Sequence, residues 1–408
     1  MQWKKLALGA LVVAGAAAVG GWFSLDKETR GLLATFPTNR DLLFWSEPQR
    51  DAAFRALDRI PLLARSHMVP ASGTPSPLPP GEPLPPGEPL PLRTDINAFM
   101  AGQRSAALLI VQGGKLRLER YGLDFDDAGR WTSFSVAKSF TSTLVGAALK
   151  DGYIRSLDDK VSDYIPDLKG SAYDDVSVRQ LLTMTSGVQW NEDYADPQSD
   201  VARFNNHQPE AGQEALVSYM RQLPRAAPPG TRWLYSTGET NLVGTLVQQA
   251  TGKPLATYLA EKVWGPAGME HDATWLVSKT GQEIGGCCIQ ASPRDYARMG
   301  LFILNGAKVD GQSIVPDGWW EAATTKQADI GRPGHGYGYQ WWTNDDGSYA
   351  ARGIFGQGIF IDPQRELVIV TNANWAGGAR DPAAMKAREQ FYREVQQAVD
   401  AEQQRSKD

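Results

Sequence analysis

Residues 131–140, WTSFSVAKSF, place Ser135 and Lys138 three positions apart at the start of a run that predicts a helix. On a helix, residues i and i+3 lie on one face with Cβ atoms roughly 5–6 Å apart. Thr132 or Ser133 can cap this helix, which would put Ser135 in the first turn, where the helix dipole favours a developing alkoxide. The pattern suits a nucleophile with its proton acceptor, and it suits a surface serine and lysine equally well.

The neighbours of Ser135 narrow the choice of chemistry. Val136, Ala137, Phe140 and Leu144 are apolar enough to bury the helix, and burial lowers the pKa of a lysine because desolvation disfavours the ammonium. A serine nucleophile needs a base. No G-x-S-x-G motif occurs and the four histidines are scattered, so the sequence does not indicate a Ser-His-Asp triad. A lysine is the base that the sequence offers instead.

Composition excludes some function classes. The 408 residues are 42% apolar and 21% charged, as in ordinary globular proteins, and the formal net charge of −5 gives no reason to expect nucleic acid. Cys287 and Cys288 are adjacent, and we expect no structural disulfide there because a vicinal bridge is strained and rare. No Cys/His spacing would hold a metal, and no cofactor is expected.

The N-terminus predicts an export signal. Lys4 and Lys5 precede an apolar run from Leu6 to Phe23, which is 18 residues long and just able to span a bilayer. We expect residues 1–25 to be a signal peptide or, preferably, an uncleaved anchor; a buried core helix is the alternative. The protein would then be exported and either anchored in the inner membrane or periplasmic.

The rest of the chain divides into three parts. Residues 26–92 hold a helical segment (38–68, with Ser46 as a possible N-cap) and a proline-rich spacer that begins at Pro77. We expect a hydrolase domain at 93–398 and a polar tail at 399–408.

Strand signals lie at both ends of this domain and helix signals in its middle. The strands are expected in a hairpin at 106–122 and at 337–342, 351–363 and 366–375. Helices are expected from residue 135 to about 150, after Ser177 as far as Gly187, after Ser292, and from about 382 to 397. This order predicts an α+β fold, in which the two ends form an antiparallel sheet flanked by helices. A helical subdomain at roughly 150–290 is inserted, with a cleft at the junction.

Several blocks resemble the serine β-lactamase and penicillin-binding superfamily, most closely its class C-like branch, which includes esterases and 6-aminohexanoate-dimer hydrolase. They are RWTSFSVAKSFTSTLVGAAL (130–149), SLDDKVSDYIPDLKG (156–170), VSVRQLLTMTSGVQWNEDY (176–194), LYSTGETNLVGTLVQQATGKPLATYLAEKVWGPAGM (234–269) and ASPRDYARMGLFILNG (291–306). Several blocks in the family's order are more specific than any one of them. The resemblance implies a β-lactamase/transpeptidase-like fold over roughly residues 95–375.

The same resemblance implies roles for three residues. Ser135 would be the acylated nucleophile and Lys138 its helper. Tyr235 would match the tyrosine of the family's Y-x-N or Y-x-S element, sharing one proton with Lys138; a phenol near pKa 10 can act as a base only beside a cation. A core tyrosine is the alternative. Thr237 stands where many members have asparagine.

The family's third element, a K-T-G or H-x-G strand, corresponds to Ile354–Gly358. Phe355 replaces its cation, which argues against penicillins and cell-wall peptides, since both present a carboxylate. The amide of Gln357 or Gly358, next to Gly356, would complete an oxyanion hole with that of Ser135. A glycine-rich bulge is compatible with this role.

Two loop aromatics, Trp190 and Tyr194, are expected over the cleft. Tyr194 resembles a tyrosine that contacts the substrate amide in nylon-oligomer hydrolases, although a loop aromatic covering the core is an equal alternative. The two cysteines would line the cleft, or be buried inert thiols.

The sequence therefore predicts a serine hydrolase that cleaves a small-molecule amide or ester through an acyl-enzyme on Ser135, similar to 6-aminohexanoate-dimer hydrolase. One alternative is a D-Ala-D-Ala carboxypeptidase or β-lactamase. Another is a non-catalytic binder of a cell-wall peptide or protein.

Overall fold

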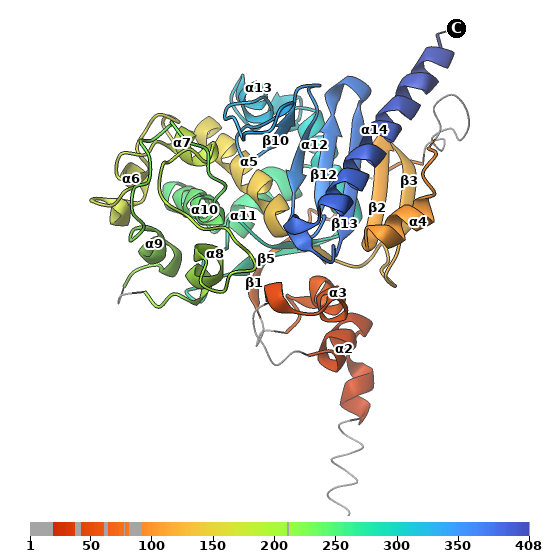
Figure 1. Ribbon diagram of the computed structural model, residues 1–408, viewed down its shortest axis with the longest axis horizontal. Helices are drawn as coiled ribbons and strands as arrows, with labels where there is room; N and C mark the ends of the chain where they lie inside the picture. Colours follow the sequence, from red (N-terminus) through yellow and green to blue (C-terminus); the bar gives the residue numbers. More distant parts are fainter. Residues whose placement is uncertain are drawn as a thin grey trace, which may run out of the picture.

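The two ends of the predicted hydrolase domain meet in one sheet, as expected from the sequence. The computed structural model describes residues 19–36, 42–60, 64–76, 78–80, 92–209 and 212–407. Within them, seven antiparallel strands run in the order β3-β2-β13-β12-β11-β10-β9 (Figure 1). Their bounds are β2 (Ser105–Gln112), β3 (Lys115–Tyr121), β9 (His335–Tyr337), β10 (Trp342–Asn344), β11 (Tyr349–Arg352), β12 (Gly358–Asp362) and β13 (Leu367–Ala373). The α+β prediction is confirmed.

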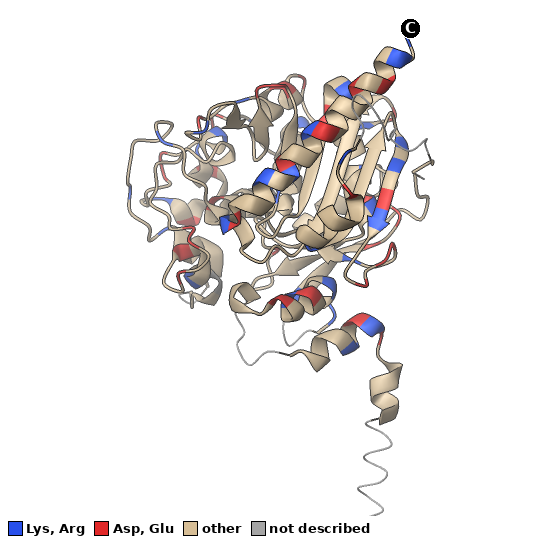
Figure 2. Ribbon diagram, turned by 45° about the vertical axis from the view of Figure 1, so that its right-hand side comes forward, with Lys and Arg blue, Asp and Glu red and all other residues tan. Residues whose placement is uncertain are grey.

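Side-chain alternation along the strands gives the sheet two apolar faces. Leu108 and Ile110 of β2 pack against α4 (Ile96–Gly102) and α14 (Pro382–Arg405). Figure 1 shows α14 running along this face, and Figure 2 shows charged residues spaced along the same helix. Residues of the opposite face belong to the main core with α5 (Ala137–Lys150) and α12 (Pro293–Leu304). The buried α5 carries Lys138 to the edge of this core.

The inserted part is mostly helical, and the two strands at its end join a second sheet with two strands from earlier in the chain. Its helices are α6 (Val161–Tyr164), α7 (Val178–Leu182), α8 (Asp200–Arg203), α9 (Ala215–Met220), α10 (Thr237–Thr251) and α11 (Leu255–Leu259). The second sheet has the order β1-β5-β6-β4, from β1 (Arg65–Val69), β4 (Trp131–Thr132), β5 (Ala273–Val277) and β6 (Ile289–Ala291). Since β4 directly precedes the S-x-x-K element, this small sheet fixes the entry into the active-site turn.

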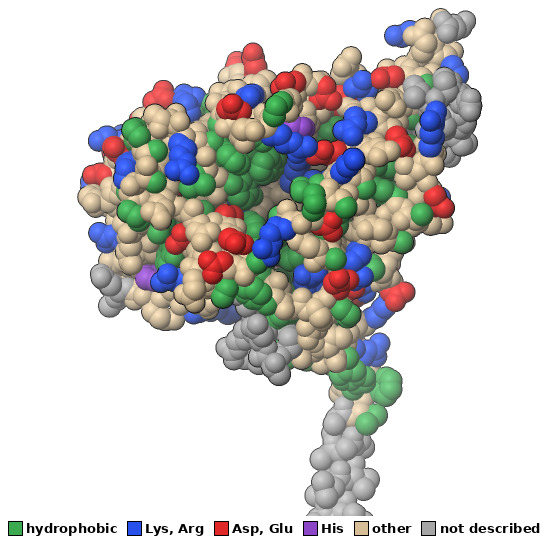
Figure 3. Space-filling model, in the orientation of Figure 1, with side chains coloured by type: hydrophobic (Ala, Val, Ile, Leu, Met, Phe, Trp, Pro, Cys, Tyr) green, Lys and Arg blue, Asp and Glu red, His purple; other side chains and the backbone are tan. Residues whose placement is uncertain are grey.

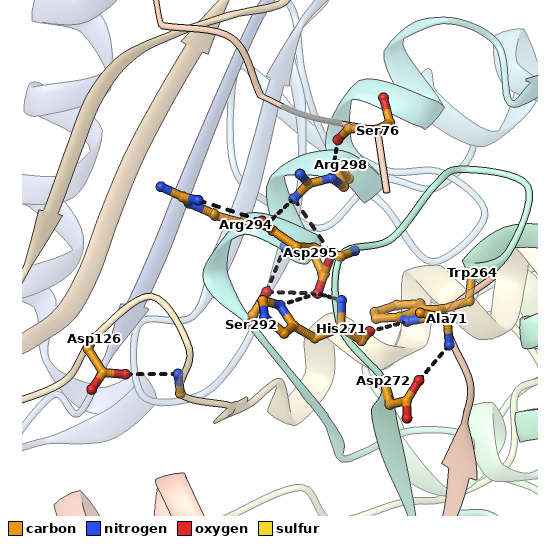
Figure 4. Close-up of polar contacts among 12 residues, drawn as sticks. Ala71, Ser76, Asp126, Trp264, His271, Asp272, Ser292, Arg294, Asp295 and Arg298 are labelled. Atoms are coloured by element: carbon orange, nitrogen blue, oxygen red, sulfur yellow. Dashed lines mark hydrogen bonds and ion pairs between the residues drawn. The ribbon is translucent and has the colours of Figure 1, made fainter. Parts of the chain in front are cut away.

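A polar cluster at the start of α12 ties this sheet to the helix (Figure 4). Ser292 caps the helix, as predicted, and Pro293 is its first residue. Asp295 is fully buried and accepts hydrogen bonds from Ser292 Oγ and from two backbone amides at Glu270 and His271. A buried carboxylate is tolerated because these donors replace its water shell.

Several elements differ in extent from the predictions. The expected helix at 38–68 is α3 (Glu47–Ala56), with the predicted cap at Ser46, whereas Arg65–Val69 is a strand because it pairs along its whole length with β5. The helix after Ser177 has the predicted capping box but ends at Leu182. The remaining elements are α2 (Lys27–Ala34), α13 (Trp319–Thr324), β7 (Lys308–Val309) and β8 (Gln312–Ser313).

The C-terminal third also differs. The expected strand at 337–342 is interrupted at Gln340, whose φ is +62°, so β9 and β10 pair as a hairpin instead. The expected strand at 351–363 is two strands, since residues 353–357 form a turn between β11 and β12. The helix α14 continues to Arg405, through most of the predicted tail.

The predicted anchor and spacer lie mostly outside the described residues. Among the described residues, no helix has both the length and the hydropathy needed to cross a membrane.

The helix α3 packs directly onto the catalytic turn, although it precedes the hydrolase domain in sequence. Phe54 is fully buried, and its ring lies 4.9 Å from that of Phe134, 5.6 Å from that of Trp131 and 5.2 Å from that of Phe355 (centroid distances). We predict that Phe54→Ala lowers the free energy of unfolding by about 3–5 kcal/mol, because it leaves a cavity among these rings. Denaturant titration measures the loss. Leu33→Ala, at a position that is 39% exposed, should lower it by clearly less than Phe54→Ala; equal effects would contradict the packing role.

Candidate active site

Ser135 lies in a 3₁₀ turn, η2 (Phe134–Val136), immediately before α5. The expected capping does not occur: Ser133 Oγ donates to Phe134 O and accepts from Ile289 N, and Val136 is the residue before the helix. Phe134 has φ of +43°, a conformation that bulky residues rarely adopt. The ring contacts with Phe54 hold this strained turn, which presents Ser135 at the cleft.

Lys138 is buried at the centre of the site, with 1% of its surface exposed. Its Nζ lies 3.1 Å from Ser135 Oγ, 2.9 Å from Thr237 Oγ1 and 2.8 Å from Gly286 O. Burial lowers the pKa of Lys138 to about 8, while the charge of Glu192 acts in the opposite direction. Near neutrality, a useful fraction of this lysine is therefore the neutral amine, which can accept the proton of Ser135.

Tyr235 lies just before α10, whose N-cap is Ser236, and its interaction with the Ser135 side chain acts to lower the pKa of the phenol. Desolvation, and next the charge of Glu192, raise the pKa of Tyr235 far above its usual range. Lys138 Nζ lies 5.3 Å from the centroid of the Tyr235 ring, and no hydrogen bond joins the amine to the phenol. The three side chains converge on Ser135, but the geometry supports a neutral phenol rather than the expected phenolate.

Glu192 is a functional residue that the sequence reasoning missed. Its carboxylate accepts from the Thr237 amide at 2.9 Å, from the Thr237 hydroxyl, and from Tyr194 Oη at 2.5 Å. It also accepts from the indole of Trp190. Thr237, at the position of the family's asparagine, therefore connects Lys138 to a carboxylate. An acidic residue two positions before Tyr194 in a loop was the available signal.

The two loop aromatics have different environments. Trp190 is 5% exposed and packs against Phe204 and Tyr219, so it belongs to the core rather than lying over the cleft. Tyr194 lines a cavity of about 390 Å³ together with Glu192. The structure thus leaves Tyr194 as the aromatic that borders open space beside the site.

The glycine-rich turn between β11 and β12 differs from the prediction. Gln357 is fully buried, accepts from the Phe355 amide and donates to Ala373 O, and Gly356 packs against the indole of Trp375. Gly358 belongs to β12, an inner strand. These three residues serve the turn and the sheet, and none borders the cavity beside the site.

Ile354 is the residue of this turn that meets the requirements for an oxyanion donor. It lines the cavity beside Tyr194, and its amide has no acceptor among the described residues. The preceding Gly353 packs so closely on the turn before Ser135 that a Cβ there would lie 2.8 Å from Ser133 O. A backbone amide that lines a cavity and has no acceptor is available to a ligand, and it can stabilise an oxyanion there.

Cys287 and Cys288 are joined to each other by a disulfide, in contrast to the expected inert thiols. Cys287 directly follows Gly286, whose carbonyl holds Lys138, and its own carbonyl accepts from the Trp275 indole at 3.0 Å. Among the described residues, no group of three or more His, Cys, Asp or Glu side chains is arranged to bind a metal.

Comparison with known proteins identifies the family. A family model described as Beta-lactamase matches residues 92–393. The chain belongs to the beta-lactamase family. Over 287 residues it is 31% identical to the 6-aminohexanoate-dimer hydrolase of Paenarthrobacter ureafaciens, a match that covers 66% of this chain and 72% of that one. It is 29% identical to a beta-lactamase of Pseudomonas fluorescens over 172 residues, covering 40% of this chain and 44% of that one.

Solved structures agree with this assignment. A structure from Bacillus anthracis, proposed to be a 6-aminohexanoate-dimer hydrolase, superposes with a TM-score of 0.76 at 21% identity, covering 90% of this chain and 99% of that one. A penicillin-binding protein from Bacillus halodurans superposes with a TM-score of 0.58 at 18% identity, covering 73% and 99%. The predicted family and fold are confirmed, and the protein is a serine hydrolase of this family.

The charge of Glu192 predicts how activity depends on pH. If neutral Lys138 is the base, kcat/KM for a neutral ester rises with pH through about 8, since the ammonium present at lower pH cannot accept a proton. Glu192→Gln removes the anion that favours the ammonium, so the same rise should move to lower pH. The measurement is a kcat/KM profile between pH 5 and 10.

A neighbouring carboxylate provides the control. Asp193 lies 3.9 Å from Arg380 and is half exposed, so Asp193→Asn should leave the midpoint of the profile in place. A midpoint that does not move in Glu192→Gln would show that this carboxylate does not act on Lys138.

Proposed function

We propose that the protein cleaves a linear amide or ester through an acyl-enzyme on Ser135. The observation that carries this proposal is the position of Ser135 Oγ, which lies 3.1 Å from the buried Nζ of Lys138, while the Ser135 side chain also interacts with Tyr235. The Ser135 hydroxyl can give its proton to Lys138 when the amine is neutral. The phenol of Tyr235, which stays protonated, can give a proton to the leaving group.

In the first half-reaction, neutral Lys138 takes the proton of Ser135 as Oγ bonds to the substrate carbonyl carbon. The resulting oxyanion accepts from the amides of Ser135 and Ile354. As the intermediate collapses, Tyr235 donates its proton to the departing nitrogen or oxygen, and the lysine ammonium returns a proton to the phenolate.

In the second half-reaction, water attacks the acyl-enzyme and Lys138 accepts its proton. The proton passes to Oγ as the acyl group leaves as the acid. Thr237 and Glu192 keep the amine pointing at Ser135 throughout, because Thr237 Oγ1 accepts from Lys138 while the hydroxyl itself donates to the carboxylate.

The preferred substrate class is a linear amide like that named for the Paenarthrobacter relative, or an ester. The second candidate is β-lactamase or D-Ala-D-Ala carboxypeptidase activity, which the match to the Pseudomonas protein favours. Phe355 argues against it: the side chain is 3% exposed and packs between Phe54 and Phe134, where the family has a cation.

The nucleophile and the phenol can be tested separately. A fluorophosphonate probe should label the protein, and Ser135→Ala should abolish the labelling. Tyr235→Phe should lower turnover of p-nitrophenyl butyrate by at least about 10², because a positioned proton donor is lost. No labelling, or labelling that survives Ser135→Ala, would favour a non-catalytic binder, and unchanged turnover in Tyr235→Phe would remove that residue from the mechanism. Hydrolysis of nitrocefin in preference to linear amides would favour the second candidate.

We also propose that the N-terminal segment holds the protein to a membrane after export. Residues 19–24 are helical, and Val19, Trp22 and Phe23 are 56%, 40% and 70% exposed. Exposed aromatic and aliphatic side chains next to an apolar run are typical of a membrane interface.

The membrane proposal predicts how the protein fractionates. The full chain should sediment with membranes and resist extraction by alkaline carbonate, whereas a chain starting at residue 26 should stay in the supernatant with its esterase activity. Equal distributions of the two chains would contradict the anchor.

A further inference from the structure

Residues 286–289 contact both of the elements that carry the catalytic groups. At the start of this segment, Gly286 O accepts a hydrogen bond from Lys138 Nζ at 2.8 Å. At its end, Ile289 O accepts from Ser133 N at 2.8 Å, and Ile289 N donates to Ser133 Oγ at 2.9 Å. Ser133 lies two residues before the nucleophile. The lysine and the turn of the serine are therefore held by two residues that only the adjacent cysteines separate.

The backbone of the two cysteines is itself fixed by hydrogen bonds. Cys287 N donates to Ile284 O at 3.1 Å, and Cys287 O accepts from the Trp275 indole at 3.0 Å. Cys288 O accepts from Leu276 N at 3.1 Å, which joins this residue to β5. These contacts leave the segment little freedom, so a change at the cysteines is passed on to the residues next to them.

Gly286 has no space to move toward the lysine. A Cβ on this glycine would lie 2.9 Å from Thr237 Cγ2 and 3.2 Å from Lys138 Nζ. The Gly286 amide donates to Asn241 Oδ1 at 2.9 Å. Because the Gly286 carbonyl belongs to the planar peptide bond with Cys287, any rotation of the Cys287 backbone changes the direction in which that carbonyl points. The position of Lys138 Nζ therefore depends on the conformation of Cys287.

The disulfide between Cys287 and Cys288 restrains that conformation. Two bonded sulfurs lie closer together than two thiols can, because atoms that are not bonded keep van der Waals separation. The Cys288 side chain is 5% exposed and belongs to the main core, whereas Cys287 is partly exposed and packs against that core. Breaking the bond therefore displaces Cys287 rather than Cys288, and the displacement reaches the carbonyl that holds Lys138.

We propose that the Cys287–Cys288 disulfide is a positioning element for Lys138, and that a dithiol which reduces this bond lowers the hydrolase activity. The proposal goes beyond the proposed function, although it rests on the role given there to Lys138. The partial exposure of Cys287 makes it the sulfur that a small dithiol reaches first.

The reduction is a thiol–disulfide exchange in two steps. A thiolate of the dithiol attacks Cys287 Sγ, the S–S bond breaks, and Cys288 Sγ leaves as a thiolate and takes a proton. The second thiolate of the reagent then attacks its own sulfur in the mixed disulfide, and Cys287 Sγ leaves and takes the other proton. Two electrons and two protons pass to the cysteines, and the dithiol is oxidised to a disulfide.

Reduction should affect turnover more than substrate binding. Figure 3 shows one face of the molecule hollowed, with hydrophobic side chains around the hollow. Neither the cavity that Tyr194 lines nor a smaller one of about 180 Å³ beside Trp233 includes any of residues 285–289 in its walls. Because Lys138 acts in both half-reactions, a misplaced amine slows acylation and deacylation together, which lowers kcat and leaves KM nearly unchanged.

Mass spectrometry tests the bond itself. The chain has two cysteines, so the oxidised and reduced forms are distinguished without ambiguity after alkylation. Iodoacetamide should add no group to the denatured, unreduced protein and one group to each cysteine after treatment with dithiothreitol. Alkylation without prior reduction would overturn the proposal.

Kinetics test the positioning role. In the folded protein, dithiothreitol should lower kcat for p-nitrophenyl butyrate by about tenfold or more and change KM by less than about threefold, because a small misplacement of a catalytic group is costly. Reoxidation with oxidised glutathione should restore the rate. The double variant Cys287→Ala, Cys288→Ala is the control: it cannot form the bond, so dithiothreitol should leave its rate unchanged.

Equal kcat values for the oxidised and reduced forms would overturn the inference, as would a loss of rate when the double variant is treated. The melting temperature of the reduced protein should stay above the assay temperature, since unfolding on reduction would overturn the positioning role in favour of a structural one. Ser135-dependent turnover that is insensitive to reduction would sink this inference alone, whereas turnover that persists in Ser135→Ala would sink the proposed function.

Discussion

The burial of one lysine sets the main constraint on this structure. Lys138 lies in the core, and a buried ammonium without partners costs several kcal/mol. One partner, Ser135, lies in the turn that directly precedes the lysine's own helix, and the other two come from distant segments: the start of α10 at Thr237 and the loop at Gly286. The fold must therefore hold these segments together, and the same convergence assembles the site. The lowered pKa of the lysine and the alignment of the serine have one physical origin.

A second constraint is the aromatic packing behind the nucleophile. Phe134, in its strained conformation, contacts both Phe54 and Phe355, which also contact each other, and the Arg50 guanidinium lies over the Phe355 ring at 4.6 Å. Two of these residues come from α3, which precedes the region matched by the family model. The N-terminal segment is thus part of the catalytic core, and the strain in the turn is held by packing contributed from outside the family domain.

Local signals in the sequence predicted the fold well, because each depends on residues that are close in the chain. The hairpin at Gly113, the capping box at Ser177 and the cap at Ser292 all occur where expected. The spacing of Ser135 and Lys138 also predicted that their side chains meet. They do so, although the serine lies in a 3₁₀ turn rather than in the helix.

Non-local features could not be predicted in this way. The role of Glu192 depends on a loop folding back onto α10, and the cavity position of Ile354 depends on how a turn between two strands packs on the nucleophile. The apolar pattern over residues 337–342 suggested one strand, but it cannot reveal that Gln340 takes a positive φ, since that conformation is imposed by hydrogen bonds to Leu182 of the helical insertion. These contacts exist only when the chain is already folded.

The distribution of positive charge distinguishes this site from the family pattern. Many members carry a cation at the strand position that Phe355 occupies here. The Phe355 side chain belongs to the core, so a cation in its place would remove a ring that supports the catalytic turn. Arg352, at the end of β11, is the next cation before that position, and its guanidinium lies 5.8 Å from the centroid of the Trp342 ring. The absence of a cation at the Phe355 position therefore changes the attraction for a substrate carboxylate without any change in the groups that transfer protons.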